Sequence, residues 1–106
     1  DALVFHQARL SALVPGYRHL REPPADAQVL DPKELDALLV PGVAFTPEGS
    51  RLGQGGGFYD RLLSQHSALV SVGIAFDIQI VDAIPHEEHD QGVLALVSER
   101  MSTLKA

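Results

Sequence analysis

The chain has 106 residues, 45% of them hydrophobic and 21% charged, which is typical of one small globular domain. Its net charge of −6 and the scattered positions of its eight basic residues argue against nucleic-acid binding. The lack of cysteine excludes disulfides, thiolate catalysis and sulfur-ligated zinc. Because the sequence contains neither a membrane-spanning apolar run nor a signal-peptide pattern, we expect no membrane partner and a cytoplasmic location.

The first third of the chain predicts short and irregular elements. Residues 2–6 have the pattern of a short strand, and residues 7–13 fit a turn or a brief helix. The stretch 15–34 contains four prolines, which remove backbone donors and favour extended, irregular backbone.

The remainder of the chain predicts strands and one helix. We expect strands at 35–40, 69–76 and 92–97, because these segments are rich in apolar and β-branched residues. Pro41-Gly42 ends the first of them. Residues 58–67 predict a helix that carries Phe58, Leu62 and Leu63 on one face. The segment 78–84 fits a strand or a helix.

Strands that are apolar on both faces and separated by a helix favour a parallel sheet covered on both sides. The predicted fold class is therefore α/β, a three-layer α/β/α arrangement with a mostly parallel sheet. Residues 1–106 would form a single domain of this kind.

A glycine loop between the predicted strand 35–40 and the predicted helix is the most informative local feature. Four of the five residues from 53 to 57 are glycine. Backbone N–H groups of such a loop can converge on a phosphate, and Arg51 and Arg61 bracket it with planar, charged donors. The spacing fits neither the P-loop nor the dinucleotide-binding fingerprint, so a plain flexible turn remains an alternative on spacing alone.

The longer string PGVAFTPEGSRLGQGGGFYDRLL, residues 41–63, resembles the signature of the 5-formyltetrahydrofolate cyclo-ligase family, also called methenyltetrahydrofolate synthetases. The resemblance extends along most of the chain. It includes Glu22-Pro23, Gly73-Ile74-Ala75-Phe76, Gln79 and the run Ile84-Pro85-His86-Glu87-Glu88-His89-Asp90.

This resemblance implies a fold, an ATP site and a folate site. The fold is the one shared by ribose-5-phosphate isomerases, glucosamine-6-phosphate isomerases and CoA transferases. The ATP site would be lined by Arg51, Leu52, Gly53, Gln54, Gly55, Gly56, Gly57, Phe58 and Tyr59. Five of these residues, Gln54, Gly55, Gly56, Gly57 and Phe58, would also contact the folate substrate. Phe58 or Tyr59 could instead pack the helix against the sheet.

Two carboxylates are candidate ligands of Mg²⁺, which prefers oxygen donors near nucleotide phosphates. Asp60 has an alternative reading as a helix N-terminal acid favoured by the macrodipole, and Asp90 could belong to a solvated loop. The resemblance implies that Asp60 and Asp90 both bind the metal. His86 and His89 lie three residues apart, but no further ligand for a transition-metal site is evident.

The implied reaction converts 5-formyltetrahydrofolate and ATP to 5,10-methenyltetrahydrofolate, ADP and phosphate. Phosphoryl transfer turns the formyl oxygen into a good leaving group, so catalysis rests on positioning and charge stabilisation. Arg51 and Arg61 are the candidate catalytic charges, although Arg61 could simply pair with a carboxylate. Thr46, Gln54 and Leu94 depart from the family pattern, which puts the substrate in more doubt than ATP.

Members of the resembled family are close to twice this length, and nothing here resembles their N-terminal basic helix. We therefore expect a C-terminal portion or a truncated paralogue, completed by a missing N-terminal segment or by a homodimer. An alternative function is a divergent protein that binds nucleotide without turnover. A sugar-phosphate isomerase of similar fold is a third reading, and the complete signature argues against it.

Overall fold

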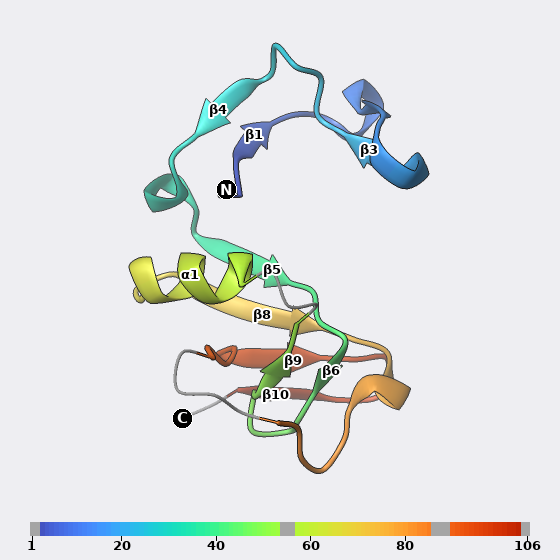
Figure 1. Ribbon diagram of the computed structural model, residues 1–106, viewed down its shortest axis with the longest axis vertical. Coiled ribbons are helices and arrows are strands. Elements are labelled where there is room, and N and C mark those ends of the chain that lie inside the picture. The colour runs from blue at the N-terminus through green and yellow to red at the C-terminus, as the bar shows by residue number, and fades with distance from the viewer. Residues whose placement is uncertain (1–2, 54–56, 86–89, 105–106) are drawn as a thin grey trace.

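The computed structural model describes residues 3–53, 57–85 and 90–104, and its central feature is a four-stranded sheet in the order β10–β9–β8–β5 (Figure 1). Strands β5 (Ala37–Val40), β8 (Val70–Ile74) and β9 (Ala95–Val97) are parallel, as predicted. Strand β10 (Ser102–Leu104) runs antiparallel to β9 and was not predicted. The molecule is therefore α/β with a mixed sheet.

Helix α1 (Phe58–Gln65) lies across β5 and β8 in Figure 1, and it confirms the predicted helix with a slightly earlier end. Its N-cap is Gly57, whose φ of 70° is in the left-handed region that glycine adopts without strain. Leu62 and Leu63 are buried against the sheet. Phe58, which we predicted on the same face, is 40% exposed instead.

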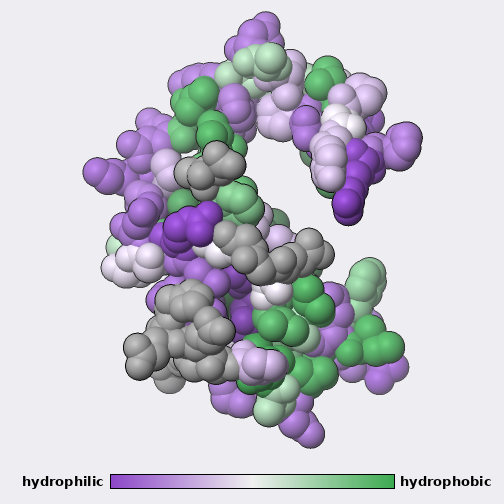
Figure 2. Space-filling model, in the orientation of Figure 1, coloured by the Kyte–Doolittle hydropathy of each residue, from purple (hydrophilic) through white to green (hydrophobic). Residues whose placement is uncertain are grey.

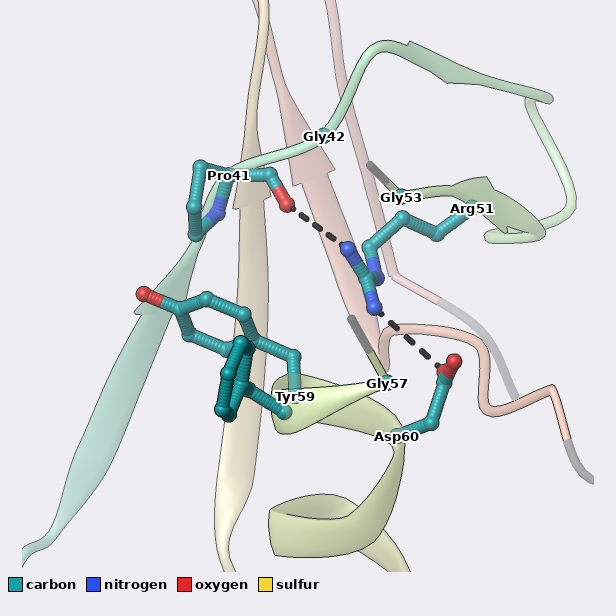
Figure 3. A pocket seen from close by; sticks show the side chains of 8 residues that line it. Pro41, Gly42, Arg51, Gly53, Gly57, Tyr59 and Asp60 are labelled. Carbon is teal, nitrogen blue, oxygen red and sulfur yellow. Dashed lines mark hydrogen bonds and ion pairs between the residues drawn. The ribbon is translucent and has the colours of Figure 1, made fainter. Parts of the chain in front are cut away.

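A hairpin between β5 and α1 was missed by the sequence analysis. Strand β6 (Ala44–Phe45) pairs antiparallel with β7 (Arg51–Leu52). Phe45 is fully buried, and a Cβ on Gly73 would lie 2.7 Å from its ring, so the hairpin packs directly on β8. This packing holds Arg51 near the carboxyl end of β5 (Figure 3).

The segment 78–84 is neither a helix nor a strand of the sheet. A 3₁₀ turn, η4 (Asp77–Gln79), follows β8. Ile80 then forms an isolated parallel bridge with Phe45. This bridge ties the segment after β8 to the hairpin.

Among the described residues the sheet is covered on one face, so its expected cover on the second face is not confirmed. Leu38 and Val40 are buried, whereas Leu39 between them is 62% exposed. The described residues contain one α-helix, and it lies on the face of the buried side chains. The opposite side, here named the open face, exposes apolar side chains of three strands: Leu39, Val70, Ile74 and Val97. The second helical layer of a three-layer fold is therefore not found in the described part of the chain.

The N-terminal third forms an arm that extends from the sheet, separated from it on one side by a hollow (Figure 2). In the arm β1 (Phe5–Gln7) pairs with β4 (Gln28–Leu30), and β2 (Val14–Pro15) pairs with β3 (Arg21–Glu22). Short 3₁₀ turns, η1 (Leu10–Ala12), η2 (Tyr17–His19) and η3 (Pro32–Glu34), complete it. No side chain of residues 3–36 is buried, which agrees with the predicted irregular structure.

No helix in residues 3–53, 57–85 or 90–104 is both long and apolar enough to cross a membrane.

Candidate active site

A pocket of about 460 Å³ opens where β5 ends and α1 begins (Figure 3). Ligands of open α/β sheets bind at the carboxyl ends of strands, which is where this pocket lies. Eight residues of the strand end, the glycine loop and the start of the helix line it: Pro41, Gly42, Arg51, Gly53, Gly57, Phe58, Tyr59 and Asp60. Six of these eight residues belong to the predicted loop and helix start, residues 51–60.

Arg51 crosses the base of the pocket and connects its two walls. Its Nη1 donates to the carbonyl oxygen of Pro41 at 3.1 Å, and its Nη2 donates to Asp60 Oδ1 at 3.3 Å. The guanidinium also lies 5.5 Å from the centre of the Tyr59 ring, a cation–π distance. Nε of Arg51 is buried and has no hydrogen-bond partner among the described residues.

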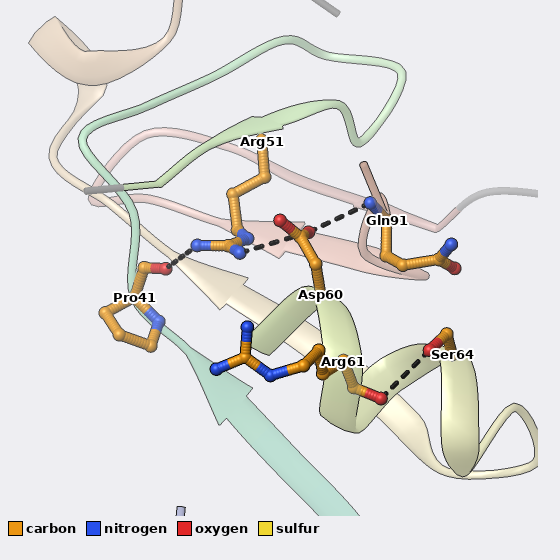
Figure 4. A network of polar contacts seen from close by, with 6 residues as sticks. All are labelled: Pro41, Arg51, Asp60, Arg61, Ser64 and Gln91. Atoms are coloured by element: carbon orange, nitrogen blue, oxygen red, sulfur yellow. Dashed lines mark hydrogen bonds and ion pairs between the residues drawn. The ribbon is translucent and has the colours of Figure 1, made fainter. Parts of the chain in front are cut away.

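Asp60 connects the pocket to the segment that contains the second predicted metal ligand (Figure 4). Its Oδ1 accepts from Arg51 and also from the backbone N–H of Gln91 at 3.0 Å. Its side chain is 18% exposed, so a ligand in the pocket can reach it. Asp90 precedes Gln91 in the chain and is partly buried, so its backbone lies next to a residue that contacts Asp60. Sequence reasoning missed the Gln91 contact because a backbone donor carries no sequence signal.

This donor set fits Mg²⁺ better than a transition metal. The described residues contain no group of three or more His, Cys, Asp or Glu side chains that could hold a metal ion. Two carboxylates suit a hard cation that takes its other ligands from water and phosphate oxygens. His86 and His89, the alternative ligands, lie outside the described residues.

The two described ends of the glycine loop are each approached by an arginine. A Cβ on Gly53 would lie 2.9 Å from Arg51 Nη1, and a Cβ on Gly57 would lie 2.9 Å from Arg61 Nη1. Both guanidinium groups therefore reach the loop, as the positions of the two arginines on either side of it predicted. Gln54, Gly55 and Gly56, predicted to bind both ATP and folate, lie outside the described residues.

The two aromatic residues of the site have different surroundings. Tyr59 packs against the core, in agreement with the prediction that one of the pair holds the helix to the sheet. Phe58 lines the pocket while 40% exposed, and the Arg61 guanidinium lies 5.1 Å from its ring centre. Phe58 is therefore available to stack on a flat ligand.

Several residues singled out in the sequence do not line the pocket. Leu52 belongs to β7 and pairs with β6. Thr46 is buried in the hairpin turn, where its Oγ1 accepts from the Ser50 N–H at 3.2 Å. Leu94 donates its N–H to Ser71, and Glu22 lies in the arm. Two of the three departures from the family pattern, Thr46 and Leu94, thus leave the pocket lining unchanged.

A model of the 5-formyltetrahydrofolate cyclo-ligase family matches residues 4–99, which is most of the chain. The chain belongs to this family. It is 45% identical over 91 residues to the 5-formyltetrahydrofolate cyclo-ligase of Escherichia coli K12, covering 83% of this chain and 50% of that protein. The Haemophilus influenzae cyclo-ligase is 47% identical over 72 residues, which cover 65% of this chain and 38% of the relative.

Solved structures agree with this family assignment. The 5,10-methenyltetrahydrofolate synthetase of Aquifex aeolicus superposes with a TM-score of 0.75 at 35% identity, covering 92% of this chain and 49% of that one. The chain thus spans about half the length of the Escherichia coli cyclo-ligase and of the Aquifex synthetase.

Proposed function

We propose that this protein takes part in the ATP- and Mg²⁺-dependent conversion of 5-formyltetrahydrofolate to 5,10-methenyltetrahydrofolate, with release of ADP and phosphate. The observation that carries the proposal is the pocket base, where Arg51 pairs with Asp60 beside the glycine loop that the family signature predicts. A charged pair facing an open pocket suits a phosphorylated ligand better than an apolar one.

Nucleotide phosphates would bind at the loop, between its two arginines. The Arg51 guanidinium reaches Gly53, and the Arg61 guanidinium reaches Gly57 at the start of α1. The catalytic role proposed for both is to stabilise charge on the transferring phosphoryl group, which needs positioned donors rather than covalent chemistry. The residues proposed to line the ATP site remain 51–59, with 54–58 also contacting the folate.

Asp60 and Asp90 are the proposed ligands of Mg²⁺. Asp60 lines the pocket, and the Gln91 N–H holds the segment of Asp90 against it. Bound Mg²⁺ would neutralise phosphate charge. Asp60 would then orient the nucleotide, while Arg51 and Asp60 together keep the pocket base in place.

The other half of the family's length would complete the protein. We propose that residues 1–106 correspond to the C-terminal portion of a cyclo-ligase and that the remaining portion packs on the open face. Two observations support this. The open face exposes four large apolar side chains, and β5 is an edge strand of the sheet formed by the described residues. Such packing would supply the missing layer of the predicted three-layer fold. A homodimer through the same surface is the alternative.

Spectrophotometric turnover of 5-formyltetrahydrofolate with Mg·ATP tests the proposal, using the longest natural form of the protein. Methenyl product should form only with ATP, and Asp60→Asn should abolish most of it. Asp36→Asn is the matched control, because it removes the same charge from an exposed residue outside the pocket. Equal rates for Asp60→Asn and the unsubstituted protein would refute the site.

A divergent protein that binds nucleotide without turnover is the second candidate, because Gln54 departs from the family pattern within the glycine loop. Calorimetry separates the two. Binding of Mg·ATP by a folded protein that forms no product, alone or with a separately expressed other half, would support the second candidate.

A further inference from the structure

The loop after β5 has three consecutive carbonyl oxygens, each engaged by a side-chain donor from another part of the chain. Arg51 binds the oxygen of Pro41. Gln79 binds the next two: its Nε2 donates to the oxygen of Gly42 at 3.1 Å and to that of Val43 at 3.2 Å. Pro41 and Gly42 line the pocket, so Gln79 holds part of the pocket wall from behind.

The orientation of the Gln79 amide is fixed by a third contact. Its Oε1 accepts from the backbone N–H of Phe76 at 2.8 Å. An acceptor facing this N–H turns the NH₂ group toward the two carbonyls, so all three contacts require the same amide orientation. Gln79 therefore clamps the end of β5 to the turn that follows β8.

Carbonyl oxygens beside an anion site are unfavourable when they lack donors, because their partial negative charge repels phosphate. Gln79 donates to both carbonyls, and at Gly42, which lines the pocket, this donor offsets the charge. The two hydrogen bonds also keep the loop from moving toward the space between Arg51 and the glycine ends. The family resemblance marked Gln79 in the sequence, but it implied no role for this residue.

We propose that Gln79 is a positioning residue for the nucleotide pocket, acting through the carbonyls of Gly42 and Val43. This inference rests on the proposed function only in taking Mg·ATP as the ligand. The clamp keeps the wall in its binding geometry before the ligand arrives, so Gln79 acts on the KM for ATP more than on kcat.

Two substitutions separate the clamp from a merely local role in η4. Gln79→Glu keeps an oxygen for the Phe76 N–H but loses the donors and directs a carboxylate at two carbonyls. Gln79→Met has similar length and loses all three contacts. Ile78→Ala is the matched control, since its side chain in the same turn is 89% exposed.

We expect the KM for ATP to rise about tenfold in Gln79→Glu and several-fold in Gln79→Met, with kcat within about twofold and Ile78→Ala unchanged. Measurements are made well below the melting temperature, so that loss of folded protein does not contribute. A Gln79→Glu enzyme with the normal KM would overturn the clamp, because the contact with Phe76 alone would then suffice. A normal KM in Gln79→Met would overturn it as well.

A second readout keeps this inference separate from the proposed function. Carbon-13 shifts of the Gly42 and Val43 carbonyls, measured without ligand, should move in both Gln79 variants and stay in place in Ile78→Ala. If the unsubstituted protein neither binds nor turns over ATP, the proposed function fails, and these shifts alone decide the clamp. Unmoved shifts would overturn the clamp whatever the activity.

Discussion

The pairing of Arg51 with Asp60 can be tested by a double-mutant cycle in which Arg51→Met and Asp60→Asn are made singly and together. The side chains are 5% and 18% exposed, and their closest N–O distance is 3.3 Å. Because both groups are largely removed from water, we expect the pair to contribute more than an exposed ion pair does.

The expected magnitudes follow from what each change leaves behind. Among the contacts of the described residues, Arg51→Met leaves the Asp60 carboxylate with the Gln91 N–H and leaves the Pro41 oxygen without its side-chain donor. We expect the free energy of unfolding to fall by about 2–3 kcal/mol. This is less than for a fully buried pair, because Asp60 keeps one contact and remains partly exposed to water. Asp60→Asn keeps an acceptor for the Gln91 N–H but loses the charge, so we expect the free energy of unfolding to fall by about 1–2 kcal/mol. The double variant should be less destabilised than the sum by about 1–2 kcal/mol.

Urea denaturation measures these differences, and thermal melting should show about 4–8 °C for each kcal/mol in a domain of this size. Lys33→Met with Asp36→Asn is the control cycle, because both side chains are exposed and should show no coupling. Mg·ATP should stabilise the unsubstituted protein and fail to stabilise the double variant. This should hold even though the double variant loses less stability than the sum of the two single losses. Additive effects at Arg51 and Asp60 would refute the pairing.

Three further predictions concern Gly57, the contact of Gly73 with Phe45, and the open face. Gly57→Ala should destabilise the protein by about 1–2 kcal/mol, because φ is 70° at this position. Gly57→Asn should destabilise it less, because asparagine tolerates the left-handed region. Chemical denaturation compares the two variants. Gly73→Ala should cost about 1–3 kcal/mol by overpacking against Phe45, and Phe45→Leu in the same chain should recover part of it; additive melting shifts would contradict this contact. Leu39→Lys on the open face should leave the isolated chain as stable as before while weakening complementation by the other half at least tenfold in a turnover assay; unchanged complementation would exclude this face as the docking surface.

The site was largely predictable where one residue type is required at one position. A glycine loop that starts a helix needs a left-handed residue, and Gly57 supplies it. Asp60 in the first turn is favoured by the helix dipole, so its place beside the loop followed from the helix itself. Pro41-Gly42 ended the strand as expected.

The contacts that shape the pocket could not be predicted in the same way. The strands of the hairpin have two residues each, which is too few for a periodic pattern. The sequence therefore did not predict the hairpin that brings Arg51 to the Pro41 carbonyl. The partners of Asp60 and Gln79 include backbone groups far away in the chain. Such contacts depend on the fold and not on the identity of the partner residue.

The second cover of the sheet is not found among the described residues, because apolar composition does not say which chain supplies the cover. Leu39 and Ile74 are as apolar as the buried Leu38 and Leu96, yet they face away from α1. The alternation of burial along β5 becomes visible only when the helix is placed.

Removal of Mg²⁺ should weaken ATP binding far more than screening alone would, because the empty pocket is already balanced in charge. Arg51 is paired with Asp60, so at the pocket base free ATP would meet a cation whose charge is already balanced by a carboxylate. A metal ion bound to Asp60, as proposed, would reverse this balance, because it would occupy the carboxylate and leave Arg51 to the phosphates. We therefore expect excess chelator to lower the affinity for ATP at least about tenfold, or about 1.4 kcal/mol, in calorimetric titrations at constant ionic strength. In Asp60→Asn the same addition of chelator should have little effect, because one ligand of the metal is gone. Equal ATP affinity with and without Mg²⁺ in the unsubstituted protein would show that Arg51 binds phosphate while still paired, and Asp60 would then be a structural partner of Arg51 alone.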